Sequence, residues 1–278
     1  MESIGSLWLY VVFFGIVTVM LLVDFLGFKQ KQNQDVSVKQ AAYWSVAWVT
    51  VAMLFGGGLW LYLQQTAGVA LANQKAMEYF AGYLLEKSLA IDNVFVWLMI
   101  FAAFAIPPML QRKILLYGVL GAIVLRTIFI FIGAWFVQEF SWVLYIFGAF
   151  LVYTGFKFLK GQDEDTNIED NALLKWLRKH MRITPQLHDN QFFVRQNGVL
   201  WATPLLLVLI LVEASDVIFA VDSIPAIFAV TSDPFIVLTA NLMAILGLRA
   251  MFFLLAGAAT KLHYLPYGLG IIFLFIGA

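Results

Sequence analysis

Long apolar runs that recur along the whole chain constrain its fold more than any other feature. Leu7–Met20, Ile114–Phe136 and Val199–Val212 approach or reach the ~20 residues that a helix needs to cross ~30 Å of hydrocarbon. Of the 278 residues, 62% are hydrophobic and 12% are charged, whereas soluble domains have roughly 45–50% and 25%. The sequence therefore predicts an all-α, polytopic transmembrane helix bundle.

Breaker residues and charges divide the chain into eight predicted helices. They are expected near 6–26, 41–63, 77–104, 113–137, 141–159, 199–228, 235–257 and 264–278. Four parts follow: two N-terminal helices in 1–65, a three-helix unit in 77–159, a loop with an amphipathic helix in 160–198, and a second three-helix unit in 199–278. The last helix stops at Ala278, and we therefore expect the natural protein to be longer.

Basic residues are distributed unevenly between the joins of these helices. Thirteen Lys and Arg residues lie in, or at the edges of, the joins after helices one, three, five and seven. The joins after helices two, four and six contain only Lys75. By the positive-inside rule, the basic side faces the cytoplasm and the N-terminus lies outside. No basic segment precedes the first apolar run, so this run is predicted to be a retained helix.

The one long join, 161–197, has an acidic part followed by a basic part. Its acids lie within 163–170, and 172–180 has the pattern of a basic amphipathic helix. An interfacial helix at the cytoplasmic leaflet is the favoured interpretation. A regulatory or metal-sensing role for the acidic run is the alternative.

Two parts of the chain resemble each other. Val119–Gly133 is similar to Leu242–Ala256, and at nearly the same offset Asp92–Phe95 matches Asp216–Phe219. Each copy holds three predicted spans, and an odd number makes the second copy enter the membrane from the opposite side. We therefore predict two inverted three-helix repeats, an arrangement in which transporters place the substrate near the midplane.

Five acidic residues lie well inside apolar segments, where each ionised group costs at least ~2.5–3.5 kcal/mol at the helix centre. They are Glu86, Asp92, Glu213, Asp216 and Asp222. Hard divalent cations would offset this cost because they bind carboxylate, amide, carbonyl and water oxygens. Further oxygens are expected nearby from Ser88, Asn93, Ser215, Ser223 and Asn241. The pattern predicts an all-oxygen metal site to which both repeats contribute.

The residue types narrow the ion without selecting one. The chain has no cysteine, and its three histidines, His180, His188 and His263, all fall in joins. This disfavours zinc and copper and leaves manganese, magnesium and calcium. Competition between protons and metal for the same carboxylates would couple export to a proton gradient.

Purely structural ion pairs and a proton relay are the alternatives to a metal site. Lys87, Arg126 and Arg249 are the basic residues predicted near the five acids, and two negative charges remain after pairing (5 − 3 = 2). One divalent ion or two protons would match them. Arg126 and Arg249 occupy equivalent repeat positions, where they could neutralise the site during the return step or serve only in packing.

The segment 199–228 is expected to be a discontinuous helix. At 1.5 Å per residue it would be about 45 Å long, against a ~30 Å core. Asp222 follows Glu213 by nine residues, which places the two on opposite sides of a straight helix. A break near Pro225 would let freed carbonyls face the site.

Two motifs carry a resemblance to a known family. Glu86–Val96 and Val212–Pro234 resemble the TerC/Alx family of integral membrane proteins, in particular its Alx-type bacterial manganese exporters. The resemblance runs from about Val38 to the end of the chain. It implies a nine-helix protein of the bacterial inner membrane that exports Mn²⁺ and uses the five acids as ligands.

The resemblance also supplies a second hypothesis, an assembly factor that delivers metal to exported proteins at the translocon. An enzyme is not expected, because the acids are accompanied by no nucleophile motif and no cofactor fingerprint. The expected partners are a divalent metal ion and the lipid bilayer, with a translocon contact under the second hypothesis and no nucleic acid under either.

Overall fold

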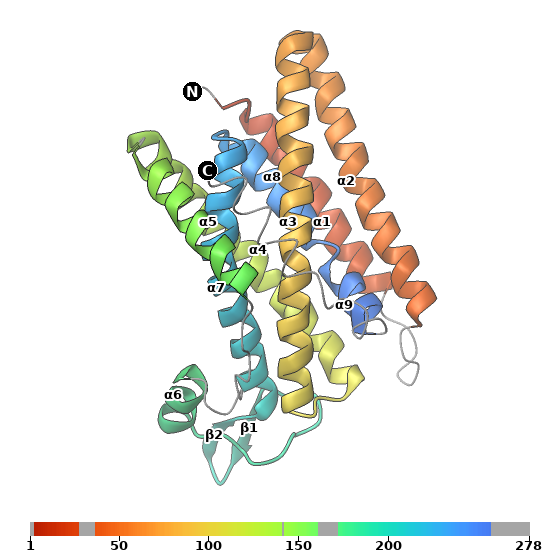
Figure 1. Cartoon of the computed structure of the whole chain (residues 1–278). Helices are drawn as coiled ribbons and strands as arrows, with labels where there is room; N and C mark the ends of the chain where they lie inside the picture. Colours follow the sequence, from red (N-terminus) through yellow and green to blue (C-terminus); the bar gives the residue numbers. More distant parts are fainter. Residues whose placement is uncertain (1–2, 28–36, 141, 161–171, 257–278) are drawn as a thin grey trace.

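The computed structural model describes residues 3–27, 37–140, 142–160 and 172–256 (Figure 1). The elements in these ranges are α1 (Leu7–Gly27), α2 (Val38–Thr66), α3 (Val69–Ala103), α4 (Pro108–Glu139), α5 (Val143–Lys160), α6 (Ala172–His180), β1 (Phe193–Gln196), β2 (Val199–Ala202), α7 (Pro204–Val230), α8 (Pro234–Ile245) and α9 (Leu248–Ala256). The predicted all-α bundle is confirmed. The predicted helix 264–278 lies outside the described residues.

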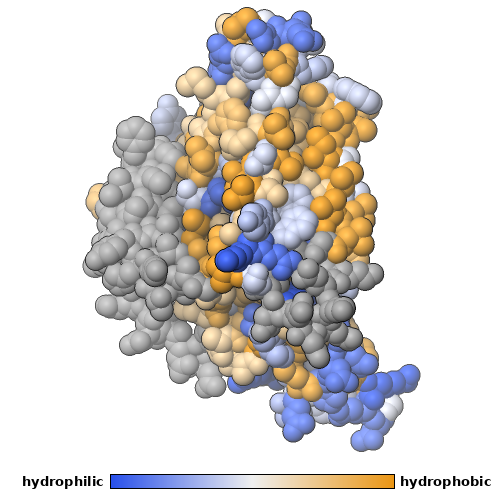
Figure 2. Space-filling model, turned by 90° about the vertical axis from the view of Figure 1, so that its right-hand side faces the viewer, coloured by the Kyte–Doolittle hydropathy of each residue, from blue (hydrophilic) through white to orange (hydrophobic). Residues whose placement is uncertain are grey.

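Five stretches of the described chain are long and apolar enough to cross a membrane. They are Leu7–Leu26, Val38–Thr66, Pro108–Glu139, Pro204–Val230 and Pro234–Ala256, the last of which combines α8 and α9. Apolar side chains cover much of the described surface between two more polar ends (Figure 2). Surface of this kind needs lipid rather than water around it, so the chain is a multi-pass membrane protein.

The charged helix α3 lies inside the bundle although its charges lower its hydropathy. It has 35 residues and packs against α2, α7 and α8. All twelve residues of α8 are buried, as expected of a helix that is apolar on every side. Helices α3, α4, α7 and α8 therefore form the interior of the described bundle.

The helices alternate in direction (Figure 1). In this view α3 descends and α4 ascends, whereas α7 ascends and α8 with α9 descends. Corresponding helices of the two predicted repeats thus run in opposite directions, as inverted copies require. The N-terminus and the connections α2–α3, α4–α5 and α7–α8 lie at one end, and α6 and the hairpin lie at the other.

The predicted break near Pro225 is wrong, because α7 is continuous and contains Pro225. A proline removes one backbone donor, but packing against neighbouring helices lets a membrane helix continue past it. The helix is also shorter than predicted, because Val199–Ala202 forms β2 of a hairpin with β1. Its turn is Asn197–Gly198, with φ of 52° and 78°, a combination that Asn-Gly favours in a two-residue turn.

The interruption lies in the next transmembrane segment instead. Helix α8 ends at Ile245 and α9 begins at Leu248, so the helix predicted for 235–257 is divided. Lys87 of α3 donates a hydrogen bond to the Ala244 carbonyl at 3.0 Å. A side chain at Gly247 would obstruct it, since an added Cβ would lie 2.9 Å from Lys87 Nζ. The lysine therefore satisfies a carbonyl at the end of α8.

Candidate functional site

Arg126 of α4 is the centre of a buried polar cluster. Its guanidinium is 1% exposed and pairs with two carboxylates, Glu86 of α3 through Nη1 and Asp216 of α7 through Nε and Nη2. The contacts with Asp216 measure 3.2 Å from Nε to Oδ2 and 2.9 Å from Nη2 to Oδ1. This two-pronged contact matches the planar donor geometry of arginine.

Polar side chains from two of these helices and from α8 surround the same guanidinium. Arg126 Nη1 lies 3.5 Å from Ser223 Oγ and 3.4 Å from Asn241 Oδ1. Asn93 of α3 donates to Asp216 Oδ1 at 3.4 Å. Among the described residues, Asn93 Oδ1 and Glu86 Oε2 are buried oxygens with no hydrogen-bond partner. The cluster therefore holds acceptor oxygens beyond those that Arg126 binds.

A small pocket adjoins Arg126 and brings in two more of the predicted acids. It is lined by Leu89, Asp92, Asn93, Arg126, Phe219, Asp222 and Ser223. Its free space is about the minimum that a single water molecule or ion needs. Asp92 comes from α3 and Asp222 from α7, the helices that also supply Glu86 and Asp216. Four of the five predicted acids thus lie around Arg126 and this pocket.

Glu213, the fifth acid, contacts α4 at another point. Its carboxylate lies against Gly121, where an added Cβ would be 2.0 Å from Glu213 Oε1. Its Oε2 is buried and has no hydrogen-bond partner among the described residues. The absence of a side chain at Gly121 therefore creates the space that this carboxylate occupies.

Three of the expected supporting residues have other contacts. Ser215 donates to Val212 O at 2.7 Å, and Ser88 donates to Leu84 O at 2.8 Å, each within its own helix. Arg249 of α9 pairs with Asp24 of α1 at 2.5 Å. Asp24 is not predictable as a buried acid, because an acid three residues before the end of α1 has the pattern of a helix boundary. In the structure it is buried, with 3% of its surface exposed.

The acids are arranged around an arginine and not around a closed metal cage. Within the four described ranges, no group of three or more Asp, Glu or His side chains is close enough to hold a metal ion. Glu86 and Asp216 instead turn their oxygens to the guanidinium. The structure thus shows two carboxylates sharing one cation that the chain itself provides.

The TerC family of integral membrane proteins matches residues 71–278, which include every residue of this cluster. The chain belongs to the TerC family. Among its relatives, a Photorhabdus laumondii protein is 59% identical over 100% of this chain and 87% of its own length, and one from Salmonella typhi is 55% identical over 100% and 86%. Both are named Alx and described as proposed membrane-bound redox modulators.

A more distant relative of this TerC chain is an uncharacterized membrane protein of Myxococcus xanthus. It is 45% identical over 99% of this chain and 83% of its own length. No solved structure matches the chain. The comparisons confirm the family that the two sequence motifs predicted.

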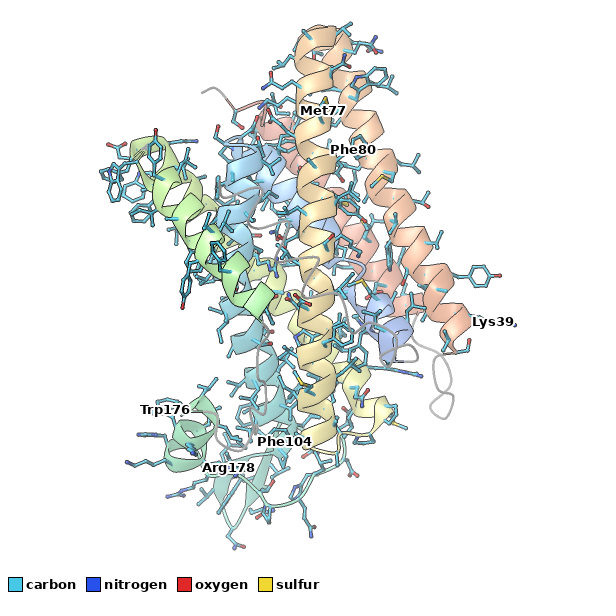
Figure 3. All side chains as sticks on the ribbon, in the orientation of Figure 1. Lys39, Met77, Phe80, Phe104, Trp176 and Arg178 are labelled. Atoms are coloured by element: carbon cyan, nitrogen blue, oxygen red, sulfur yellow. The ribbon has the colours of Figure 1, made fainter. Side chains whose placement is uncertain are left out.

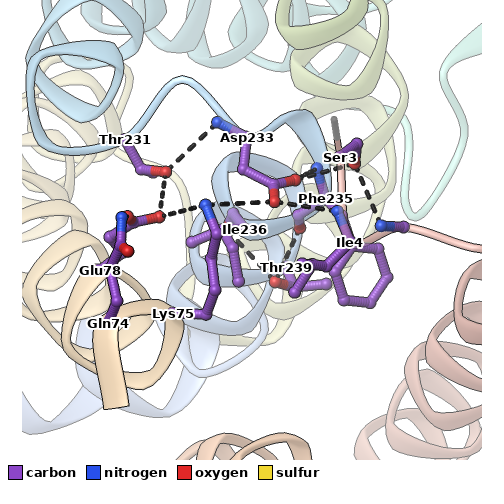
Figure 4. Close-up of polar contacts among 11 residues, drawn as sticks. Ser3, Ile4, Gln74, Lys75, Glu78, Thr231, Asp233, Phe235, Ile236 and Thr239 are labelled. Atoms are coloured by element: carbon purple, nitrogen blue, oxygen red, sulfur yellow. Dashed lines mark hydrogen bonds and ion pairs between the residues drawn. The ribbon is translucent and has the colours of Figure 1, made fainter. Parts of the chain in front are cut away.

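A second polar network of this TerC protein joins the start of α3 to the connection between α7 and α8 (Figure 4). Glu78 Oε2 accepts from Lys75 Nζ at 2.9 Å and from Thr231 Oγ1 at 2.5 Å, and Lys75 also contacts Asp233 at 3.4 Å. Asp233 accepts from Ser3 Oγ at 2.8 Å. The network ties together the ends of the two helices that carry the buried acids.

Sequence reasoning missed this network because its residues occupy predicted joins and helix ends. Asp233 did carry a signal, since an acid directly before Pro234 is a typical helix N-cap. The structure shows this cap, with Asp233 Oδ1 accepting from Phe235 N at 3.1 Å. A cap alone, however, does not predict contacts with Lys75 or Ser3.

Proposed function

We propose that this TerC protein is a secondary transporter that exports Mn²⁺ from the cytoplasm of a bacterium in exchange for protons. The supporting observation is the convergence of four acids, the buried Glu86 and Asp216 and the half-buried Asp92 and Asp222, on Arg126 and one small pocket. A stable fold alone does not require such a cluster, because apolar residues of similar volume are often as stabilising as buried ion pairs. Acids kept inside a membrane are by default functional.

In this proposal Arg126 replaces the transported ion when no ion is bound. Four acids and one arginine carry three net negative charges when all are ionised (4 − 1 = 3). A divalent cation entering the pocket between Asp92 and Asp222 would compete with the guanidinium for Asp216 and Glu86. Release of the ion would let Arg126 return and offset one of the negative charges during the reverse step, while protons would offset the others.

Protons provide the exchange partner for the metal. Carboxylates bind metal in their ionised form, so a proton and Mn²⁺ compete for the same oxygens. A higher proton concentration outside would favour metal release there. We expect export to accelerate when the outside is more acidic than the inside.

The choice of manganese combines chemistry with family resemblance. The cluster offers carboxylate, amide and hydroxyl oxygens, which suit Mn²⁺, Mg²⁺ and Ca²⁺ alike. The resemblance to manganese exporters selects Mn²⁺ among them. The redox role named for the relatives would act here through the redox-active metal, because these 278 residues contain no cysteine for thiol chemistry.

Metal flux into liposomes tests the proposal. Purified protein is reconstituted around a manganese-sensitive dye, and Mn²⁺ entry is compared for the wild type, Asp92→Asn and Asp216→Asn. We expect each variant to lose at least ~10-fold in rate, because an amide is a weaker ligand and carries no charge. Asp189→Asn makes the same chemical change on an exposed residue of the α6–β1 connection and should keep the wild-type rate.

Two outcomes would contradict export. Undiminished flux in both site variants would show that the cluster is not on the path of the ion. Mn²⁺ binding without any flux in the wild type would instead favour the metal-delivery hypothesis.

A further inference from the structure

The helix α6 presents a basic face outside the bundle. Its nine residues include four cationic or titratable bases and no acid, and all four are exposed. They are Lys175, Arg178, Lys179 and His180. A short helix of this charge attracts anions.

The opposite face fixes the orientation of α6. Leu174 and Leu177 are 1% and 3% exposed, and the helix packs against α7. Turning the basic face inward would expose both leucines to water. The cations are therefore held on the side that points away from α7.

An exposed indole lies among these cations. Trp176 is 56% exposed and stacks on His180, with ring centroids 4.6 Å apart. Trp176 and Arg178 are both exposed residues of α6 (Figure 3). Tryptophan next to Lys and Arg on one helix is typical of segments that lie in the headgroup layer of a membrane.

The position of α6 in the bundle gives it access to lipid. It lies beside the first turns of α7, at the end of the bundle that the positive-inside rule predicts to face the cytoplasm (Figure 1). Anionic lipids give the cytoplasmic leaflet its negative surface potential. The charge of α6 and its position both favour anionic lipids as its binding partner.

We propose that α6 binds the headgroups of anionic lipids in the leaflet that surrounds the protein. Lys175, Arg178 and Lys179 supply the attraction, and Trp176 enters the headgroup layer beside them. Because α6 packs on α7, the helix that carries Asp216 and Asp222, lipid binding acts directly on a helix of the carboxylate cluster. The proposal does not depend on which ion the protein transports.

A single fluorescent label on α6 tests this binding. The chain has no cysteine, so Ala172→Cys, an exposed position on α6, gives one attachment site for an environment-sensitive dye. The labelled full chain is reconstituted in phosphatidylcholine vesicles with and without phosphatidylglycerol. We expect blue-shifted emission, and quenching by headgroup-spin-labelled phosphatidylglycerol, only in the anionic vesicles. Both should disappear in ~1 M KCl, where the screening length is ~3 Å.

Charge variants of α6 identify the residues responsible. Replacing Lys175, Arg178 and Lys179 together by Ser should reduce the quenching at least ~2-fold, because each cation near an anionic surface contributes separately. The charge-conserving pair Lys175→Arg and Lys179→Arg should retain it, which distinguishes lost charge from a misfolded helix. Arg182→Ser with Arg195→Ser removes two cations outside α6 and should leave the quenching unchanged.

Two results would overturn the proposal. One is an equal response in neutral and anionic vesicles. The other is a response that ignores lipid charge but disappears when the acids of 163–170 are replaced by amides, which would make the chain's own acidic run the partner of α6.

Discussion

At the scale of single residues, Arg126 determines the electrostatics of the site. Its guanidinium, which is 1% exposed, pairs with both Glu86 and Asp216. Removing one partner of a buried ion pair costs about 3–5 kcal/mol, because the remaining charge has no compensation. Loss of the Arg126 guanidinium should also make the site bind an external cation more tightly.

Arg126→Gln should therefore lower the free energy of unfolding by about 3–5 kcal/mol without metal and should increase the stabilisation by Mn²⁺. Arg126→Lys keeps the charge but loses the two-pronged contact with Asp216, so its loss should be smaller. Thermal unfolding in detergent with and without MnCl₂ measures both effects. A glutamine variant as stable as the wild type without metal would show that the carboxylates do not need Arg126.

Gly121 has no side chain, but we expect Mn²⁺ flux to depend on it because it leaves space for the Glu213 carboxylate. In Gly121→Ala the new Cβ would overlap Glu213 Oε1, which it would approach to 2.0 Å. The carboxylate is the end of a flexible side chain and can move aside, so the cost in stability should be below the ~1–3 kcal/mol of overpacking in a rigid core, whereas the displaced carboxylate should slow Mn²⁺ flux. Glu213→Asp, one methylene shorter, should partly restore flux in the double variant.

Gly57→Ala is the control for this change, because an added Cβ there meets nothing within 4 Å. We expect wild-type flux and stability from it. Equal behaviour of Gly121→Ala and Gly57→Ala would show that Glu213 does not depend on the space beside α4.

Sequence patterns identified the buried acids because an ionisable residue inside an apolar run is conspicuous. Distances between side chains on different helices have no such signal. Arg249 aligns with Arg126 in the repeat, but its carboxylate partner is Asp24 of α1. The sequence around Asp24 or Arg249 does not predict this pair.

At the scale of elements, the Asp24–Arg249 pair joins α1 to α9. Asp24→Leu alone should cost about 3–5 kcal/mol in unfolding free energy, whereas Asp24→Leu with Arg249→Met should recover most of it, because the unpaired buried charge is gone. Chemical denaturation of the single and double variants measures the coupling. We expect this pair to join helices rather than to take part in transport, so the double variant should retain Mn²⁺ flux. Loss of flux with recovered stability would contradict this purely structural role.

The boundaries of elements were only partly predictable. Apolar runs located most of the spans, but the signal of Pro225 was misleading, and the interruption lies at Gly247, where Lys87 approaches from another helix. Such an approach is a tertiary contact that local propensity does not contain. The hairpin did have a local signal, Asn197–Gly198, which the apolar run that follows it obscured.

At the scale of the whole molecule, the directions of the helices agree with the inverted repeats inferred from sequence (Figure 1). The polar network of Lys75, Glu78 and Asp233 lies at the end predicted to face outward, and α6 lies at the end predicted to face the cytoplasm. The orientation of the chain thus determines which end admits the ion.

Labelling of single cysteines determines this orientation. Gln65→Cys and Arg195→Cys are exposed positions at opposite ends of the bundle. We expect a membrane-impermeant maleimide to label position 65 in intact cells and position 195 only after permeabilisation. The reverse pattern would place the N-terminus inside and make the proposed direction of transport wrong.

The most direct test of the central claim is the position of bound metal. Crystals grown with MnCl₂, measured at the manganese absorption edge, should show one anomalous peak between α3 and α7, within ~2.2 Å of carboxylate oxygens of Asp92 or Asp222, a distance typical of metal–carboxylate bonds. Arg126 should have withdrawn from Asp216 in that state. A fully occupied manganese peak elsewhere, with Arg126 still paired to Glu86 and Asp216, would contradict the carboxylate cluster as the transport site.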